Sequence, residues 1–102
     1  MNMSDLMKQA QQFQERLATV QNELGGKQVT GSAGAGMVSA TINGKGELLS
    51  IAIEQALVQP DNTQMLQDLI VAAVNDGLNK AKELGKSEMG KLTGGINIPG
   101  MF

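Results

Sequence analysis

The sequence predicts an α+β fold in which a long helix, a three-stranded antiparallel meander and a second long helix follow one another. Three observations predict it: an apolar stripe of helical period near each end of the chain, alternating apolar and polar residues between the stripes, and an Asn-Gly turn inside the alternating region. Three short strands are too small a sheet to cover two long helices. The expected molecule is therefore a homodimer.

The first helix is predicted over residues 3–25, because apolar residues recur there at alternating spacings of three and four. The residues of this heptad seam are Met3, Leu6, Ala10, Phe13, Leu17, Val20 and Leu24. Ser4 is expected to cap the start of the helix, and Gly25-Gly26 to end it. A second copy of the chain is expected to cover part of the seam.

Three strands are predicted between the helices. Gln28–Ser32 reads as a short strand, and Met37–Ile42 and Leu48–Ile53 alternate apolar and polar residues. Asn43-Gly44-Lys45-Gly46 joins the last two, because Asn-Gly tolerates the positive φ values of a tight hairpin turn. The three segments together predict an antiparallel meander.

The second helix is predicted from Asn62 to Leu84 or slightly beyond, with Asp61 as its N-cap and Gln64 in the capping-box position. Its apolar stripe contains Leu66, Leu69, Ile70, Ala73, Gly77, Ala81 and Leu84. A glycine inside a helix is unfavourable, so Gly77 is expected to mark a close approach to a neighbouring element.

The chain of 102 residues is expected to form a single domain over residues 1–89, followed by a flexible glycine-rich tail over residues 90–102. Histidine and cysteine are both absent. Their absence excludes the usual zinc sites, Ser–His and Cys–His nucleophile pairs, and disulfides. We therefore expect no enzymatic activity, and no metal, cofactor or small-molecule substrate. The longest strongly apolar run, Leu69–Val74, is too short to span a bilayer, and no secretory signal begins the chain. A cytoplasmic protein without a membrane partner is expected.

Charge is unevenly distributed along the chain. The net charge is −2 and the pI is about 4.9, which by itself disfavours a nucleic-acid partner. However, residues 46–79 carry −5, whereas residues 1–45 carry +1 and residues 80–102 carry +2. Lys82 and Lys86 stand four residues apart on one helix face. This leaves two interpretations open: lysines that only pair within their helix, or a stripe that meets a polyanion.

Glycine-rich segments do not predict a nucleotide site. The run Gly31–Gly36 precedes a predicted strand, whereas a dinucleotide fingerprint follows a strand and opens a helix. Gly44-Lys45-Gly46 lacks the Ser or Thr that follows the lysine of a phosphate-binding loop. Both segments are interpreted as turns.

Several segments in order along the chain resemble the YbaB/EbfC family of bacterial nucleoid-associated proteins. They are Leu6-Met7-Lys8-Gln9-Ala10-Gln11-Gln12, Val29-Thr30-Gly31, Gly34-Ala35-Gly36-Met37-Val38, Thr41-Ile42-Asn43-Gly44, Asn75-Asp76 and the tail ending Pro99-Gly100-Met101-Phe102. The resemblance implies a helix, three strands and a helix, a tight homodimer with helices projecting like tweezer arms, and binding of double-stranded DNA in the nucleoid with a role in gene regulation.

The leading hypothesis is therefore a dimer that contacts DNA phosphates through basic groups on both helices. The candidate DNA-binding residues are Lys8, Gln9, Gln12 and Arg16 on the first helix and Lys80, Lys82 and Lys86 on the second. The alternative is a non-catalytic adaptor that docks a recombination or replication factor through its apolar seams and its tail.

Overall fold

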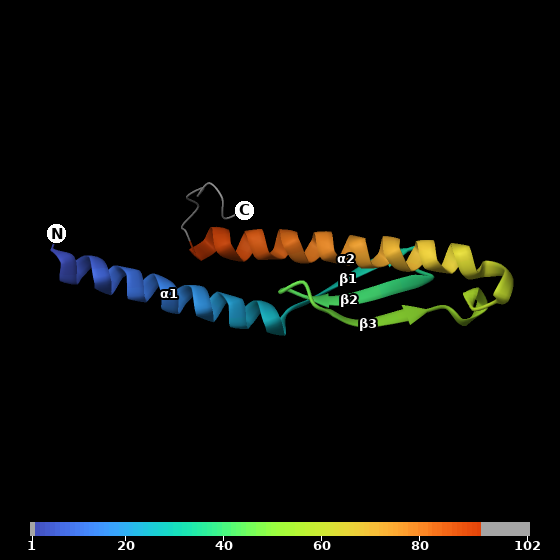
Figure 1. Ribbon diagram of the computed structural model, residues 1–102, viewed down its shortest axis with the longest axis horizontal. Coiled ribbons are helices and arrows are strands. Elements are labelled where there is room, and N and C mark those ends of the chain that lie inside the picture. Colours follow the sequence, from blue (N-terminus) through green and yellow to red (C-terminus); the bar gives the residue numbers. More distant parts are fainter. Residues whose placement is uncertain (1, 93–102) are drawn as a thin grey trace.

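A computed structural model describes residues 2–92 of the chain, and they form an elongated molecule of 69 × 22 × 16 Å. The elements are α1 (Met3–Gly26), β1 (Gln28–Ala33), β2 (Val38–Asn43), β3 (Leu48–Ile53), the short 3₁₀ helices Gln55–Leu57 and Pro60–Asn62, and α2 (Thr63–Leu92). α1 projects away from the sheet, and α2 crosses the sheet and runs back toward α1 (Figure 1). The predicted order of helix, meander and helix is confirmed.

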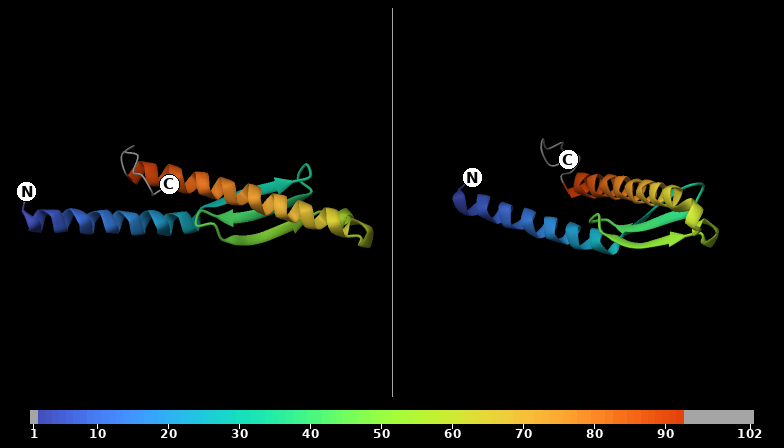
Figure 2. Two further views of the ribbon diagram at one scale, coloured as in Figure 1. Left: turned by 45° about the horizontal axis from the view of Figure 1, so that its top comes forward. Right: turned by 45° about the vertical axis from the view of Figure 1, so that its right-hand side comes forward.

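The sheet is antiparallel in the order β1-β2-β3, and α2 covers only part of it. Directly opposed residues of neighbouring strands lie on the same face of a sheet. Val38, Ala40 and Ile42 of β2 therefore share one face with their pairing partners on β1 and β3, and this is the face that α2 packs against. These three residues are at most 1% exposed. α2 packs across β1 and β2 (Figure 2). Every residue of β3 is exposed, which leaves an apolar edge strand open.

Two glycines bring α2 and β1 into backbone contact. A Cβ added to Gly31 of β1 would collide with the backbone of Ala73 and Gly77 in α2. A Cβ added to Gly77 would lie 2.6 Å from Ile42 Cδ1. The expectation that Gly77 marks a close approach is confirmed, and this contact fixes where α2 crosses the sheet.

The helix caps differ from those predicted. Asn2, not Ser4, caps α1: the Asn2 side-chain oxygen accepts a hydrogen bond from the Asp5 backbone N–H at 2.9 Å. Asp61 is not an N-cap, because it lies inside the 3₁₀ helix that precedes α2. The predicted capping box is absent, since the Gln64 side chain donates to Asp68 one turn further on.

The second helix is longer than predicted. α2 continues to Leu92, so the boundary of the expected tail at residue 90 is wrong. The last turns of α2 are held by contacts with residues that are remote in the sequence. One of these contacts is the ion pair between Lys27 and Glu88. The rest of the predicted tail, residues 93–102, lies outside the described residues.

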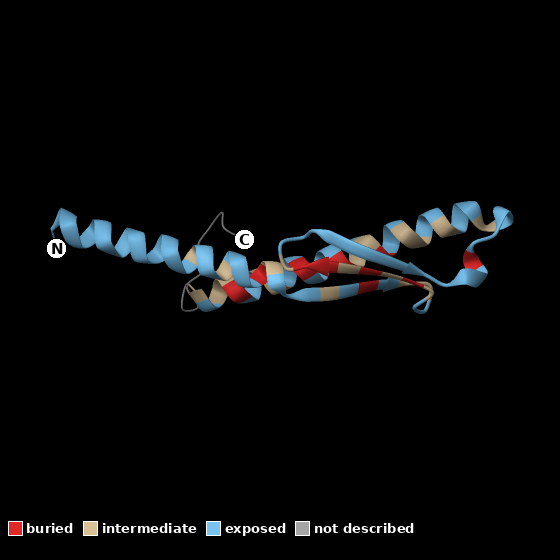
Figure 3. Ribbon diagram, turned by 90° about the horizontal axis from the view of Figure 1, so that it is seen from below, coloured by how far each residue is buried: buried red, intermediate tan, exposed pale blue. Residues whose placement is uncertain are grey.

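The seam of α1 is covered only at its carboxyl end. Leu24 is buried, and Leu17 and Val20 are half-buried, where α1 meets α2. Phe13 and Leu6 are 38% and 52% exposed, and the free part of α1 is exposed along its length (Figure 3). The protomer therefore leaves the amino-terminal half of the seam without cover.

Candidate nucleic-acid interface

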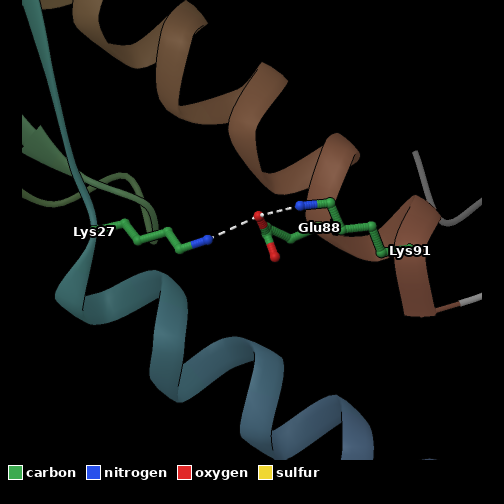
Figure 4. Close-up of polar contacts among 3 residues, drawn as sticks. All are labelled: Lys27, Glu88 and Lys91. Carbon is green, nitrogen blue, oxygen red and sulfur yellow. Dashed lines mark hydrogen bonds and ion pairs between the residues drawn. The ribbon is translucent and has the colours of Figure 1, made fainter.

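Glu88 ties α2 to the junction between α1 and β1. Its Oε1 atom lies 2.8 Å from Lys27 Nζ and 3.3 Å from Lys91 Nζ, so one carboxylate accepts hydrogen bonds from two ammonium groups (Figure 4). These two hydrogen bonds, that of Lys27 foremost, hold the pKa of Glu88 below its ordinary value. Two of the eight basic residues are thereby engaged within the protomer, and neither was a predicted DNA contact.

Lys80 is also occupied within the protomer. Its ammonium group donates to the Thr30 backbone carbonyl at 2.9 Å and lies 3.2 Å from Asp76 Oδ2. Asp76 in turn accepts from the Ser32 backbone N–H, and this bond together with that of Lys80 lowers the pKa of Asp76. Lys80 and Asp76 therefore fasten α2 to the edge of β1.

Lys82 and Lys86 line a groove of about 450 Å³ between α1 and α2. Its apolar floor is formed by Leu17, Leu24 and Met89. Lys86 has one loose ion pair, with Glu83 at 3.9 Å, and no ion pair with Lys82 occurs within residues 2–92. The prediction that these two lysines share a face is confirmed.

The sequence reasoning missed Lys45. A smaller pocket of about 240 Å³ adjoins the groove and shares Lys82 and Gly85 with it. Lys45, in the β2–β3 turn, lines this pocket together with Lys82. The available signal was a lysine at the tip of an Asn-Gly hairpin, but nothing in the sequence places that hairpin against the two helices.

Gln12 and Arg16 lie elsewhere. They line a second groove between α1 and α2, of about 650 Å³, together with the carboxylates of Glu15, Glu23 and Glu88. The structure therefore separates Arg16 from Lys82 and Lys86.

Lys8 and Gln9 lie further out, on the exposed part of α1 beyond the region where α1 meets α2. They line neither of the grooves described above. The predicted residues of α1 and α2 are thus not brought into one cluster within a protomer.

An apolar surface runs beside α2. Leu48, Ile51 and Ile53 of β3 are 36–47% exposed, and their pairing partners lie on the face of the sheet that α2 covers. Val71 and Leu78 of α2 are exposed as well. A monomer rarely exposes so many aliphatic side chains together, which indicates a protein contact.

Comparison with known proteins decides the family. Residues 1–96 match the YbaB/EbfC DNA-binding family. The chain belongs to this family. A nucleoid-associated protein of Desulfotalea psychrophila is 54% identical over 99 residues, which cover 97% of this chain and 93% of that protein. One of Clostridium novyi is 54% identical over 102 residues, which cover 100% and 90%.

The fold of this YbaB/EbfC chain also has a solved counterpart. The crystal structure of an uncharacterized protein from Helicobacter pylori superposes with a TM-score of 0.82 at 25% identity, covering 91% of this chain and 98% of that one. The chain is thus of a nucleoid-associated DNA-binding family, whose name describes no enzyme class.

Two further findings concern residues 2–92 of this YbaB/EbfC chain. Neither α1 nor α2 contains a stretch long and apolar enough to cross a bilayer. Within the same range, no three His, Cys, Asp or Glu side chains gather in a way that would hold a metal ion.

The segments that carried the resemblance have structural roles. Gly31 permits the contact with α2, and Asp76 fastens α2 to β1. Asn43 orders the β2–β3 turn, because its Oδ1 atom accepts from the backbone N–H groups of Lys45 and Glu47. These residues therefore account for the fold, whereas a contact with DNA depends on the charged side chains.

Proposed function

We propose that the protein is a homodimer that binds double-stranded DNA mainly through phosphate contacts, and that it acts in the nucleoid to organise DNA and regulate genes. The family membership and the names of the relatives support DNA as the partner and the nucleoid as the location. The single observation that carries the proposal is the groove with Lys82 and Lys86 at its edge and no carboxylate in its lining.

The exposed apolar surface supports the homodimer. β3 is an edge strand without a charged residue, and an exposed apolar edge of this kind is a template for pairing with another chain. Val71 of α2, which is 59% exposed, continues the surface beside the sheet. A second copy that covers these aliphatic side chains removes them from water and places two sets of lysines in one assembly.

Phosphate contacts follow from the side chains available. Lysine ammonium groups bind phosphate oxygens without reading sequence, so binding is expected to be salt-dependent and of low sequence specificity. The described residues contain one aromatic side chain, Phe13, which gives little support for stacking on single strands. That Lys8, Gln9, Gln12 and Arg16 also contact DNA stays a prediction.

Measuring duplex binding against salt concentration tests the function. Lys82→Gln with Lys86→Gln should weaken binding to all duplexes and flatten the slope of log affinity against log salt by roughly one unit per lost contact. The single variants Lys82→Gln and Lys80→Gln form a matched pair, because both remove one charge from α2. Lys80→Gln should weaken binding less, since its ammonium group is already held by Asp76 and Thr30.

Absence of duplex binding by the wild-type protein at low salt would overturn the proposal. An unchanged affinity and slope in the double variant, with helicity preserved, would overturn the role of the two lysines. The adaptor function would then be favoured, because the same groove has the apolar floor that a docked peptide requires.

A further inference from the structure

The line along which α1 and α2 meet separates two faces of opposite charge. Three lysines and no carboxylate line the two adjoining pockets on one side, which we call the basic face: Lys45, Lys82 and Lys86. The groove on the other side, which we call the acidic face, is lined by the carboxylates of Glu15, Glu23 and Glu88 and the cations Arg16 and Lys91. The basic residues predicted from the sequence are thus divided between two unlike surfaces.

Helical geometry explains the division. On α1, Leu17, Gln21 and Leu24 are spaced by four and three residues and line the basic face. Arg16 and Glu23 are seven residues apart and line the acidic face. Consequently the glutamine that accompanies the lysines is Gln21, whereas Gln12 lies with the carboxylates.

Lys45 is held at the basic face by the docking of its turn onto the end of α1. The Gly44 backbone N–H donates to the carbonyl oxygens of Leu24 and Lys27, at 2.9 Å in each case. A Cβ built on Gly25 would lie 3.2 Å from Lys45 Cε and 3.6 Å from its Nζ, so the lysine side chain rests on the last turn of α1.

The nearest acidic residue in the sequence does not neutralise Lys45. The Glu47 carboxylate accepts a hydrogen bond from the Asn43 side-chain amide at 2.8 Å. No carboxylate lies within ion-pair distance of Lys45 or Lys82 in the described part of the chain. A purely structural reading remains for Lys45, because a cation at a helix carboxyl end interacts favourably with the helix dipole.

We propose that double-stranded DNA docks on the basic face, that Lys45 is a phosphate-contacting residue there, and that Arg16 lies outside the docking surface. The proposal rests on the DNA-binding function proposed above. At physiological ionic strength charges are screened over about 8 Å, which is less than the roughly 10 Å thickness of a helix. A duplex on one side of the helix pair therefore responds to the cations of that side.

The test compares charge-matched single variants of the full-length protein in duplex-binding salt titrations. Lys45→Gln, Arg16→Gln and Lys91→Gln each remove one positive charge per protomer, so the net charge of the three proteins is equal. Lys45→Gln should weaken binding as much as Lys82→Gln and flatten the salt slope by about one unit per protomer. Arg16→Gln and Lys91→Gln should leave the slope close to that of the wild type.

Thermal unfolding of the same variants distinguishes a phosphate contact of Lys45 from its interaction with the helix dipole of α1. If Lys45→Gln lowers the melting temperature but leaves the slope unchanged, Lys45 is a structural residue and the proposal fails. Equal losses for Arg16→Gln and Lys45→Gln would show that DNA responds to net charge and would also overturn it. In either case wild-type binding and its loss in Lys82→Gln would still support the DNA-binding function, so the two proposals fail separately.

Discussion

Glu88 shows how a single residue can hold two elements together. Within residues 2–92 it is the one charged residue that is buried, and its two lysine partners come from the junction between α1 and β1 and from its own helix. Buried carboxylates are unfavourable unless paired, so both partners matter to this site. Lys27 and Lys91 are therefore better understood as structural cations than as DNA contacts.

Glu88→Gln should lower the melting temperature at neutral pH. The pKa of Glu88 is depressed in the folded protein, so the stability that this carboxylate contributes is complete above its ordinary pKa and is lost as pH falls through the folded-state pKa. The difference in melting temperature between wild type and Glu88→Gln should therefore narrow as pH falls from about 5 to about 3. Thermal unfolding followed by circular dichroism at a series of pH values measures it.

Glu83→Gln is the matched control for this variant. Glu83 carries the same charge on the same helix, but it is 74% exposed and its nearest cation is 3.9 Å away. Exposed pairs of this kind contribute little, so this variant should unfold like the wild type at every pH. A Glu88→Gln deficit that stays constant from pH 7 to pH 3 would contradict the ionic explanation.

At the scale of elements, α2 is positioned by a close backbone contact with β1 as well as by side chains such as Leu69 and Ile70 that pack against the core of the sheet. Gly31 and Gly77 let the helix touch β1 directly, and the small residues Ala73 and Ala81 on the same side of α2 are fully buried. Two more attachments, Asp76 to Ser32 and Lys80 to Thr30, flank this contact. The crossing point of α2 on the sheet thus depends on the absence of side chains.

Gly31→Ala should destabilise the fold by about 2 kcal/mol or more, because the new methyl group collides with backbone atoms that cannot move aside. Gly85→Ala serves as the opposite control. Gly85 lies inside α2 with open space around a built Cβ, so alanine should stabilise the protein by about 0.5 to 1 kcal/mol. Chemical denaturation gives both free energies of unfolding, and equal effects of the two substitutions would contradict the backbone-contact model.

Most elements could be predicted because their periodicity is strong. Two helical stripes, an alternating strand and an Asn-Gly turn determine the order of elements. The ends of the two helices were harder to predict. Asn2 competes with Ser4 as the cap of α1, and the last turns of α2 are stabilised by the bond from Lys27 to Glu88, which lies 61 residues away in the sequence. Such contacts depend on the assembled fold and leave no local pattern.

The candidate interface was predictable only within one helix. Lys82 and Lys86 share a face because they are one turn apart, which the sequence shows directly. Lys45 joins them only because its turn docks on the end of α1, and Arg16 is separated from them because packing decides which side of α1 faces α2. Sequence reasoning supplied the residue types but not their distribution between the two faces.

At the scale of the whole molecule, the protomer has more apolar surface than a small soluble chain normally exposes. β3, one side of α2 and the outer half of the α1 seam are all uncovered. This uncovered apolar surface is the structural reason for expecting two copies of the chain. β3 and the exposed residues beside it on α2 form the part of that surface that lies at the sheet.

Ile51→Asp should convert the proposed dimer to a monomer. Ile51 is 39% exposed on the face of the sheet that α2 packs against, along β3, where α2 leaves it uncovered, and a carboxylate there would be buried without a partner in the proposed dimer. Ser50→Asp introduces the same charge one residue away, on the opposite face, and should leave the dimer intact. Light scattering after size exclusion should give about twice the 10.7 kDa chain mass for wild type and Ser50→Asp, and about that mass for Ile51→Asp.

A monomeric wild-type protein with full helicity at micromolar concentration would contradict the proposed dimer. Dissociation of neither variant would place the interface elsewhere, and dissociation of both would show that the effect is not specific to the face that Ile51 occupies.

α1 has the geometry of a lever arm. The helix has 24 residues, which at about 1.5 Å per residue gives a length of roughly 36 Å, and only its carboxyl-terminal part, from about Leu17 to Leu24, packs against the rest of the protomer. The part beyond Leu17 is roughly 20 Å long, so a tilt of about 10° there would move the far end by roughly 4 Å, whereas Lys82 and Lys86 on α2 would stay in place. In the proposed dimer, the span between two such arms would therefore be set by a few contacts at their base.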